Sequence, residues 1–251
     1  MSENNKGMID SMPSNSAFKL GIFIGVASMF IIGFFILLLA KFDIKGLAGN
    51  KDNTNNIVNN QGNIPDNGQQ PVAISINPLT KDDWVNGDEK AKISIIEFSD
   101  ADCPYCTNYH ATMKQIMKDY DGEVNWVYRH FPLTSLHPEA AKKAEAIECV
   151  GELGDNEKVW AFLDKLYVAT KPKVAELEDV VKSLGLNGAK FTECLNSGKY
   201  TSKVAEHANQ AQAAGAQGTP YSVVLMGDQK IPVNGAYPVA EVKTILDGLL
   251  K

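Results

Sequence analysis

The sequence is poor in cysteine and has no basic stripe. Its 251 residues contain four cysteines, Cys103, Cys106, Cys149 and Cys194, which is far too few for a small disulfide-rich scaffold. The formal net charge is −6, and without a basic stripe nucleic acid is not an expected partner. There is no internal repeat. The hydrophobic content of 44% is ordinary for a globular protein with a core of its own.

One long hydrophobic run lies near the N-terminus. Residues 20–40 (LGIFIGVASMFIIGFFILLLA) carry no charge, and their length suits a helix that crosses a bilayer. We expect an uncleaved signal-anchor preceded by a cytoplasmic segment, residues 1–19. A cleaved signal peptide is the alternative, because Gly46-Leu47-Ala48 offers small residues for cleavage, although such signals usually have only about 7–15 apolar residues. Lysines flank the run on both sides, so the positive-inside rule does not decide its orientation.

The segment that follows the hydrophobic run is polar. Residues 41–72 are rich in Asn, Gln and Gly, most densely over residues 50–70. Such a composition lacks the apolar side chains that would offset the entropy of chain ordering. We expect a disordered tether between the membrane helix and a catalytic body.

The body begins with a strand, a helix and a second strand. Residues 92–99 (KISIIEFS) form a β-branched, apolar run typical of a buried strand. Apolar residues then recur at helical spacing, and residues 123–131 (EVNWVYRHF) predict another strand. The apolar helical positions are Tyr109, Met113, Ile116, Met117 and Tyr120. The three elements predict a βαβ unit with a right-handed crossover.

The rest of the body is predicted to be helical and then to return to strands. Residues 138–214 are rich in Ala, Glu, Lys and Leu and predict four or five helices. The breaks between them fall near residues 151–156, 170–173, 186–188 and 198. Residues 221–226 (YSVVLM) and 229–233 predict two strands around a Gly-Asp turn, and a C-terminal helix follows.

The segment Cys103-Pro104-Tyr105-Cys106 lies where the first strand runs into the helix. Unpaired N–H groups and the positive end of the helix dipole favour a thiolate at Cys103, and the thiolate is the reactive form. Pro104 falls in the first turn, where its missing N–H costs nothing. Cys106 is near enough to close a disulfide with Cys103. We therefore expect Cys103 to exchange disulfides and Cys106 to resolve the mixed disulfide.

A zinc site and an inert cysteine pair are the alternatives. A C-x-x-C pair supplies half of many zinc sites. However, Cys149 and Cys194 are far apart, and no two histidines stand at ligand spacing. The four histidines are expected to be surface or structural residues: His110, His130, His137 and His207. The strand-to-helix context favours redox chemistry, with no metal or flavin cofactor.

Four segments resemble the DsbA-like family of thiol–disulfide oxidoreductases, including its membrane-anchored BdbD type. They are IIEFSDADCPYC, VYRHFPLTSLHPEAAKKAEA, GAQGTPYSVVLMG and VNGAYP, and the resemblance covers residues 83–251. It implies an α/β thioredoxin fold formed by residues 73–135 and 215–251. Residues 136–214 would be an inserted all-helical domain, and Arg129-His130 lies in the family-like segment without an assigned role.

The resemblance also implies roles for individual residues. Thr219-Pro220 matches the cis-proline loop that helps bind substrate peptide beside Pro104 and Tyr105. Glu97 matches a buried acid that assists proton transfer at the buried cysteine; a strand residue that points to solvent is the alternative. The family often pairs two cysteines within its helical domain. Cys149 and Cys194 fit that pairing, and two buried, reduced thiols are the alternative.

The function that this resemblance implies is dithiol oxidation. The protein would be a monomer in the cell membrane, crossing it once with the catalytic body outside the cytoplasm, and its substrates would be cysteine-containing exported proteins. A DsbB-like or VKOR-like membrane reductase of quinone would reoxidise it. Tyr105 stands where the strong oxidants of the family carry His, which predicts a milder oxidant. The alternatives are a disulfide reductase or isomerase and a non-redox, peptide-binding chaperone.

Overall fold

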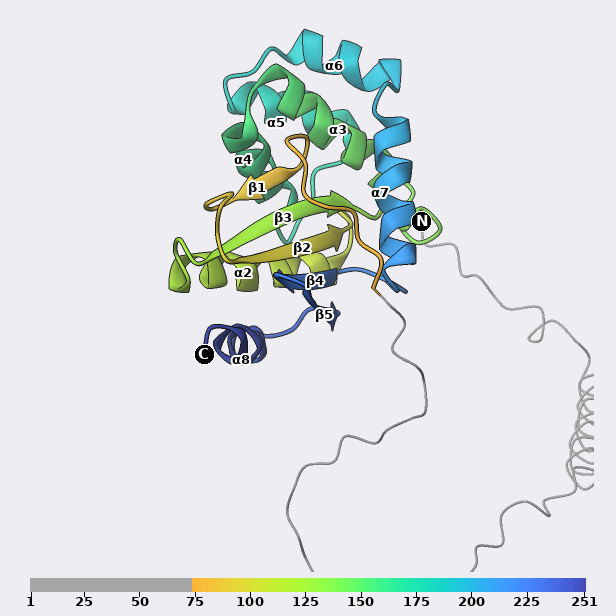
Figure 1. Ribbon diagram of the computed structural model, residues 1–251. Helices are drawn as coiled ribbons and strands as arrows, with labels where there is room; N and C mark the ends of the chain where they lie inside the picture. Colours follow the sequence, from red (N-terminus) through yellow and green to blue (C-terminus); the bar gives the residue numbers. More distant parts are fainter. Residues whose placement is uncertain (1–73) are drawn as a thin grey trace, which may run out of the picture. The chain divides into compact units, whose positions relative to one another are not determined.

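The computed structural model describes residues 74–251, which form a five-stranded mixed sheet with helices on both faces (Figure 1). In spatial order the strands are β1 (Trp84–Asn86), β3 (Val124–His130), β2 (Ile93–Ser99), β4 (Tyr221–Met226) and β5 (Gln229–Asn234). Strands β2 and β3 are parallel and every other pair is antiparallel. The predicted strands agree with β2, β3, β4 and β5. The predicted membrane helix, residues 20–40, and its flanking segments 1–19 and 41–72 lie outside the described residues.

Strand β2 is central and buried on both faces. Ile93 and Ile95 belong to the larger apolar cluster, whereas Ile96 and Phe98 belong to the smaller one. Side chains alternate between the two faces of a strand, so a strand covered on both faces is apolar throughout. Glu97 has the same parity as Ile93 and Ile95, which directs this acid toward the larger cluster.

The larger cluster joins the sheet to two helices beside it and continues into the helical block that follows β3. Helix α2 (Pro104–Asp119) buries the predicted positions Tyr109, Met113 and Ile116, and α8 (Val239–Leu249) packs beside it. Because the buried positions of α2 recur every three or four residues, one stripe of the helix faces the sheet. The βαβ and ββα units expected from the sequence thus enclose a common core.

The helical block between β3 and β4 contains α3 (Ala140–Leu153), α4 (Asn156–Leu166), η1 (Val174–Glu176), α5 (Leu177–Ser183), α6 (Gly188–Ser197) and α7 (Thr201–Ala213). The gaps between these helices overlap the four predicted breaks, whereas the boundary between η1 and α5 was not predicted. Asp155 and Asn187 accept hydrogen bonds from the N–H groups of Lys158 and Lys190, which caps α4 and α6. Helix α7 runs from the block down along the sheet (Figure 1), where Ala211 joins the smaller cluster.

Strand β1 is an addition to the predicted strands. It has three residues and pairs with β3 from Trp84↔Tyr128 to Asn86↔Trp126. The side chain of Asn156 supports it, accepting a hydrogen bond from Val85 N at 3.0 Å and donating one to Val85 O at 2.6 Å. The support comes from a helix far along the chain, which explains why no local pattern indicates the strand.

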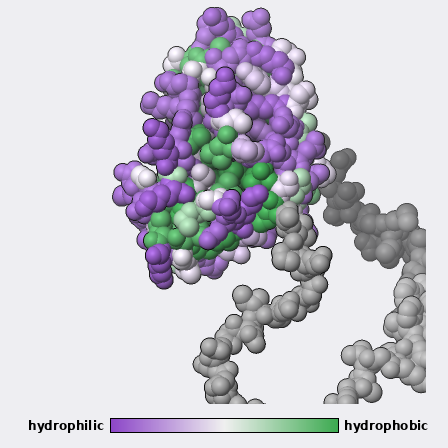
Figure 2. Space-filling view, in the orientation of Figure 1, coloured by the Kyte–Doolittle hydropathy of each residue, from purple (hydrophilic) through white to green (hydrophobic). Residues whose placement is uncertain are grey.

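The smaller cluster is covered in part by the segment before β1. Figure 2 shows hydrophobic residues gathered over the sheet and mostly hydrophilic ones over the helical block. Partly buried Ile74, Ile76, Leu79 and Leu225 pack against the smaller cluster. No helix within residues 74–251 is both long enough and apolar enough to span a membrane.

Candidate active site

The loop between β2 and α2 is fixed by Asp100. This buried carboxylate accepts hydrogen bonds from Asp102 N at 2.7 Å, Leu133 N at 2.7 Å and His137 Nδ1 at 2.9 Å. The loop after β3 is thereby held against the loop that leads into Cys103. A buried polar group must be hydrogen-bonded to be stable, so the contacts of Asp100 keep the entry to the helix rigid.

Cys103 is the N-cap residue of α2, and Pro104 occupies its first turn. Cys103 and Cys106 are both buried, unbridged thiols. The Sγ of Cys103 lies 3.4 Å from the carbonyl oxygen of Thr219. The bond between Thr219 and Pro220 is cis. The structure therefore brings together the cysteine pair and the proline loop, which are widely separated in the sequence.

The two thiols differ in acidity. A hydrogen bond with the Cys106 thiol lowers the pKa of Cys103 to about 5, with help from Thr219 and from the N–H groups of Cys106 and Tyr105. The buried Thr219 hydroxyl has no hydrogen-bond partner within residues 74–251, which leaves it free to donate to a thiolate. Burial raises the pKa of Cys106 well above its ordinary value, and the charge of Glu97 adds to the rise. Cys103 is thus the thiolate of the pair and Cys106 the thiol.

Glu97 lies inside the protein and not at its surface. Its side chain accepts a hydrogen bond from Trp126 Nε1 at 2.8 Å and is 1% exposed. Burial raises the pKa of Glu97 to about 7, although hydrogen bonds from Ser99 and Trp126 oppose the rise. A carboxyl with such a pKa can take up or release a proton near neutral pH.

A buried hydrogen-bonded chain connects this region to the helical block. Tyr167 donates to Ser99 Oγ at 2.9 Å, and the hydroxyls of Tyr128 and Tyr167 lie 3.0 Å apart. His110 of α2 stacks on the Tyr167 ring at 4.8 Å and contacts Asp164 of α4 at 2.8 Å. The end of α4 is therefore part of the wall behind the cysteines.

A cavity of about 400 Å³ lies along the proline loop. It is lined by Gly215, Gln217, Gly218, Thr219, Pro220, Tyr221, Asn234 and Gly235. Among the described residues only three large hydrophobic side chains are exposed, Tyr105, Leu136 and Val168. Tyr105 lies between the cysteines, Leu136 belongs to the loop bound by Asp100, and Val168 follows Tyr167. The cavity is therefore formed by the proline loop, whose Thr219 carbonyl contacts Cys103, and Tyr105 is an exposed apolar side chain between the two cysteines.

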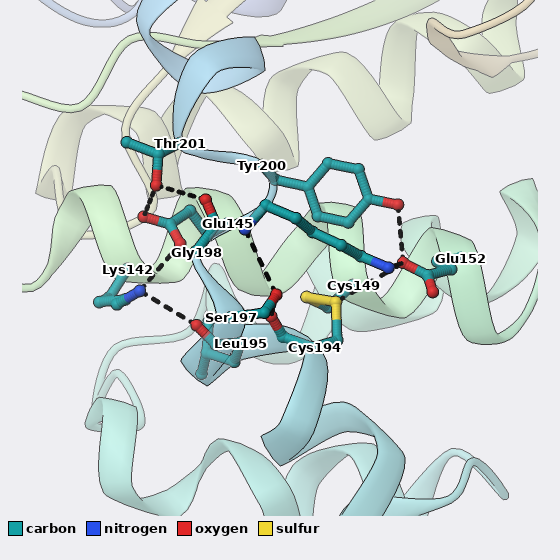
Figure 3. The surroundings of a disulfide bond; sticks show 11 residues. Lys142, Glu145, Cys149, Glu152, Cys194, Leu195, Ser197, Gly198, Tyr200 and Thr201 are labelled. Carbon is teal, nitrogen blue, oxygen red and sulfur yellow. Dashed lines mark hydrogen bonds and ion pairs between the residues drawn. A yellow bond between two sulfur atoms is a disulfide. The ribbon is translucent and has the colours of Figure 1, made fainter.

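A second pair of cysteines lies in the helical block (Figure 3). A disulfide with a Cα–Cα distance of 5.9 Å joins Cys149 of α3 to Cys194 of α6. Glu152 lies beside it, 3.7 Å from Cys194 Sγ, and accepts a hydrogen bond from the Tyr200 hydroxyl at 2.9 Å. Sequence reasoning left open whether these cysteines were bridged or reduced; in the structure they are bridged.

Two buried residues of β3 acquire partners that the sequence did not indicate. The guanidinium of Arg129 forms a two-pronged ion pair with Asp83 at 2.8 and 2.9 Å. His130 Nε2 lies 2.7 Å from Glu148 of α3, and its ring stacks on His207 of α7. Both contacts tie the sheet to segments outside it, so Arg129 and His130 serve the fold. Within residues 74–251 no group of three or more potential ligand side chains is arranged to hold a metal ion.

Comparison with known proteins identifies the family of the chain. A family model described as Thioredoxin matches residues 79–248. This chain belongs to the thioredoxin family. The match includes the cysteine pair, the helical block and the proline loop, so the expected thioredoxin fold is confirmed for the described residues.

Solved structures similar to this thioredoxin-family chain include DsbA proteins and BdbD. BdbD from Bacillus subtilis has 24% identity and a TM-score of 0.59, with 70% of this chain and 97% of that chain covered. Wolbachia pipientis alpha-DsbA1 has 22% identity and a TM-score of 0.59, covering 68% and 92%. A thioredoxin-like oxidoreductase from Silicibacter pomeroyi DSS-3 has 24% identity and a TM-score of 0.58, covering 68% and 93%. At these identities the likeness establishes the shared fold.

Curated relatives of this thioredoxin-family chain include much longer proteins. The chain is 31% identical over 139 residues to the Na(+)/H(+) antiporter NhaA 3 of Salinispora tropica, covering 55% of this chain and 21% of the relative. It is 26% identical over 168 residues to the Na(+)/H(+) antiporter NhaA of Herminiimonas arsenicoxydans, covering 66% and 25%. The chain therefore spans only about a fifth to a quarter of these relatives, whose name describes the whole antiporter.

Proposed function

We propose that this thioredoxin-family protein is a dithiol oxidase that introduces disulfides into cysteine-containing exported proteins. The observation that carries the proposal is the position of Cys103 at the start of α2. There its pKa is lowered to about 5, and its Sγ lies 3.4 Å from the backbone carbonyl oxygen of Thr219, beside the cis-proline. A stabilised thiolate lowers the free energy of the reduced, dithiol form, and the disulfide form is therefore a stronger oxidant.

The reaction begins with the Cys103–Cys106 disulfide. A substrate thiolate attacks Cys103 Sγ, a bond forms between these two sulfurs, and the electron pair of the broken S–S bond passes to Cys106 Sγ. A second substrate thiolate then attacks the substrate sulfur of the mixed disulfide, and Cys103 leaves as a thiolate. Two electrons pass from the substrate to the protein, and the two substrate protons are released or taken up by the cysteines.

We propose that Glu97 donates a proton to the thiolate formed at Cys106. Cys106 becomes a leaving group in the first step, and burial raises its pKa well above the ordinary value. A thiolate there must therefore be protonated quickly. Glu97 is buried on the same face of β2 as the larger cluster, and its pKa is raised to about 7, so it can supply a proton and regain it from solvent.

The substrate would bind as an extended segment along the proline loop. The cavity beside Thr219 and Pro220 is open to such a segment, and exposed Tyr105, Leu136 and Val168 offer apolar contacts around it. Pro104 shapes the same surface at the start of α2. The Cys149–Cys194 disulfide is proposed to stabilise the helical block without taking part in the exchange.

The location of the protein belongs to the same proposal. The hydrophobic run of residues 20–40 would anchor it as a single-pass protein of the cell membrane, and residues 41–72 would tether the body on the extracytoplasmic side, where substrates emerge. A DsbB-like or VKOR-like membrane reductase of quinone would reoxidise the cysteine pair. The protein would act as a monomer without a cofactor of its own.

The reduction potential of the Cys103–Cys106 pair tests the direction of the reaction. The full chain is equilibrated in glutathione buffers, and the fraction of the pair that is oxidised is measured by mass spectrometry. We expect a value toward roughly −120 mV, which is characteristic of DsbA. A value near about −270 mV, characteristic of thioredoxin, would contradict the oxidase and favour a disulfide reductase.

Two variants serve as controls for this experiment. Cys106→Ser removes the resolving thiol and should accumulate mixed disulfides between Cys103 and substrate proteins. Cys103→Ser with Cys106→Ser should abolish the biological activity. Full activity in that double variant would instead favour a peptide-binding chaperone.

A further inference from the structure

Lys171 reaches the first turn of α2 from the helical block. It lies in the segment between α4 and η1, and its Nζ donates hydrogen bonds to Thr107 Oγ1 at 2.6 Å and to Leu166 O at 3.4 Å. The same ammonium lies 4.9 Å above the centre of the Tyr167 ring. Thr107 directly follows Cys106, and its N–H donates to the carbonyl oxygen of Cys103 at 3.3 Å. Lys171 thus contacts the residue that closes the turn holding both cysteines.

Lys171 differs from the neighbouring lysine in having no carboxylate partner in direct contact among residues 74–251. Lys143 of α3, the other lysine beside this loop, pairs with Asp102 at 2.5 Å and with Glu139 at 3.4 Å. Lys171 makes no ion pair with any residue of the described part of the chain, 74–251. Burial lowers its pKa, and the nearby Cys106, Asp102 and Cys103 oppose this by favouring the charged form. A half-buried ammonium without a carboxylate partner attracts, and so stabilises, a negative charge that develops nearby.

In the described part of the chain, the other ionisable groups around the cysteines do not supply an unpaired positive charge that could stabilise a thiolate. The carboxyl of Glu97 opposes a thiolate, His110 contacts Asp164, and Asp100 binds His137. Tyr105, the residue between the cysteines, carries no positive charge. Among residues 74–251, Lys171 is therefore the cation near the cysteine pair that has no carboxylate partner and can stabilise a thiolate.

We propose that Lys171 is a positioning residue whose positive charge stabilises the thiolates formed when the Cys103–Cys106 disulfide opens. The proposal rests on the proposed function and deepens it. In the first step the Cys103–Cys106 bond breaks and its electron pair passes to Cys106 Sγ. In the second step the mixed disulfide between Cys103 and the substrate breaks, and the electron pair of that bond passes to Cys103 Sγ. A nearby ammonium lowers the energy of both leaving thiolates, which makes the dithiol form more stable and the disulfide form more oxidising.

The test compares charge-removing and charge-keeping substitutions in the full chain. Lys171→Met keeps much of the apolar stem and removes the charge, whereas Lys171→Arg keeps a charge. Lys165→Met is the matched control, because Lys165 is an exposed lysine in the last turn of α4. For each protein we measure the rate of alkylation of Cys103 by iodoacetamide against pH, by mass spectrometry. The reduction potential of the pair is measured in glutathione buffers.

Lys171→Met should move the alkylation midpoint of Cys103 to higher pH. The equilibrium constant for exchange between the Cys103–Cys106 pair of this variant and glutathione should shift about three- to tenfold toward the disulfide form. A tenfold shift corresponds to about 30 mV for this two-electron couple. Lys171→Arg should restore most of both values, and Lys165→Met should match the wild type. Added salt should reduce the difference between Lys171→Met and wild type, because it screens the charge.

Each contrary outcome has a distinct meaning. If Lys171→Met matches the wild type in both measurements, or if Lys171→Arg behaves like Lys171→Met, the charge of Lys171 has no such role. A thermal unfolding curve shows whether Lys171→Met remains folded, and Lys171→Gln replaces it if it does not. A wild-type protein that exchanges no disulfides would refute the proposed function itself. If the wild type is active and Lys171→Met has the same alkylation midpoint and reduction potential, only this inference is refuted.

Discussion

The buried acid Glu97 makes a quantitative prediction about stability and pH. In the unfolded chain its carboxyl loses its proton near its ordinary pKa of 4.5, and in the folded protein near about 7. Between these two pH values the folded state holds one more proton than the unfolded state, so the free energy of unfolding falls as the pH rises through this window. At about 1.4 kcal/mol per pKa unit, the loss amounts to about 3 kcal/mol.

Glu97→Gln should remove this loss, because the amide carries no charge at any pH and its oxygen can still accept the hydrogen bond from Trp126. At about pH 4 the variant and the wild type should have similar free energies of unfolding. At about pH 8 the variant should be more stable by up to about 3 kcal/mol. The measurement is urea unfolding followed by circular dichroism, in the disulfide form, where the Cys103–Cys106 pair does not titrate. The charge of Cys103, the smallest of the contributions to the pKa of Glu97, is absent in that form, so the difference should be somewhat below this figure.

Glu193→Gln is the control, because Glu193 is an exposed residue of α6. It should change the free energy of unfolding little at either pH. The reasoning is refuted if Glu97→Gln alters stability equally at pH 4 and pH 8, because a pH-independent effect would come from packing or from the hydrogen bond to Trp126. A variant that is less stable than the wild type at pH 8 would contradict it more strongly.

Three further predictions concern other parts of the molecule. Replacing Cys149 and Cys194 with alanine opens a loop with a sequence separation of 45 residues and should lower the free energy of unfolding by about 4 kcal/mol in urea titrations. Arg129→Met should cost about 3–5 kcal/mol in the same assay, because it leaves the buried Asp83 carboxylate without its partner. Tyr105→His should raise the reduction potential of the active-site pair by roughly 30 mV in glutathione buffers, equivalent to a tenfold change in equilibrium constant, and no change would show that this position does not tune the pair.

Much of the fold follows from local patterns in the sequence. The continuous apolar run of β2 requires cover on both faces, and the helical spacing of Tyr109, Met113 and Ile116 gives α2 its buried stripe. Asp155 and Asn187 cap the starts of α4 and α6 by hydrogen bonds that span three residues, so these helix starts are visible in the sequence. Short-range rules of this kind predict where an element begins and ends.

The remaining features depend on contacts between distant parts of the chain. Strand β1 is formed by pairing with β3 and by the hydrogen bonds of Asn156 to the backbone of Val85, and nothing within residues 84–86 indicates these contacts. Lys171 is one of many lysines in the sequence, and only the path of the segment after α4 brings it to Thr107. Such side chains become functional candidates only because the fold brings them close to residues far away in the sequence, and composition and spacing do not indicate these contacts.

The order of the strands has a consequence for how the protein is made. The central strand β2 pairs with β4, as in Ile95↔Val224, so the sheet is completed by residues near the end of the chain. A chain that emerges from its N-terminus exposes Cys103 and Cys106 long before Thr219 and Pro220 exist. During that interval the thiols lack the wall that later covers them. The reactive pair of a nascent molecule is therefore less protected than that of the finished protein until the last strands complete the sheet.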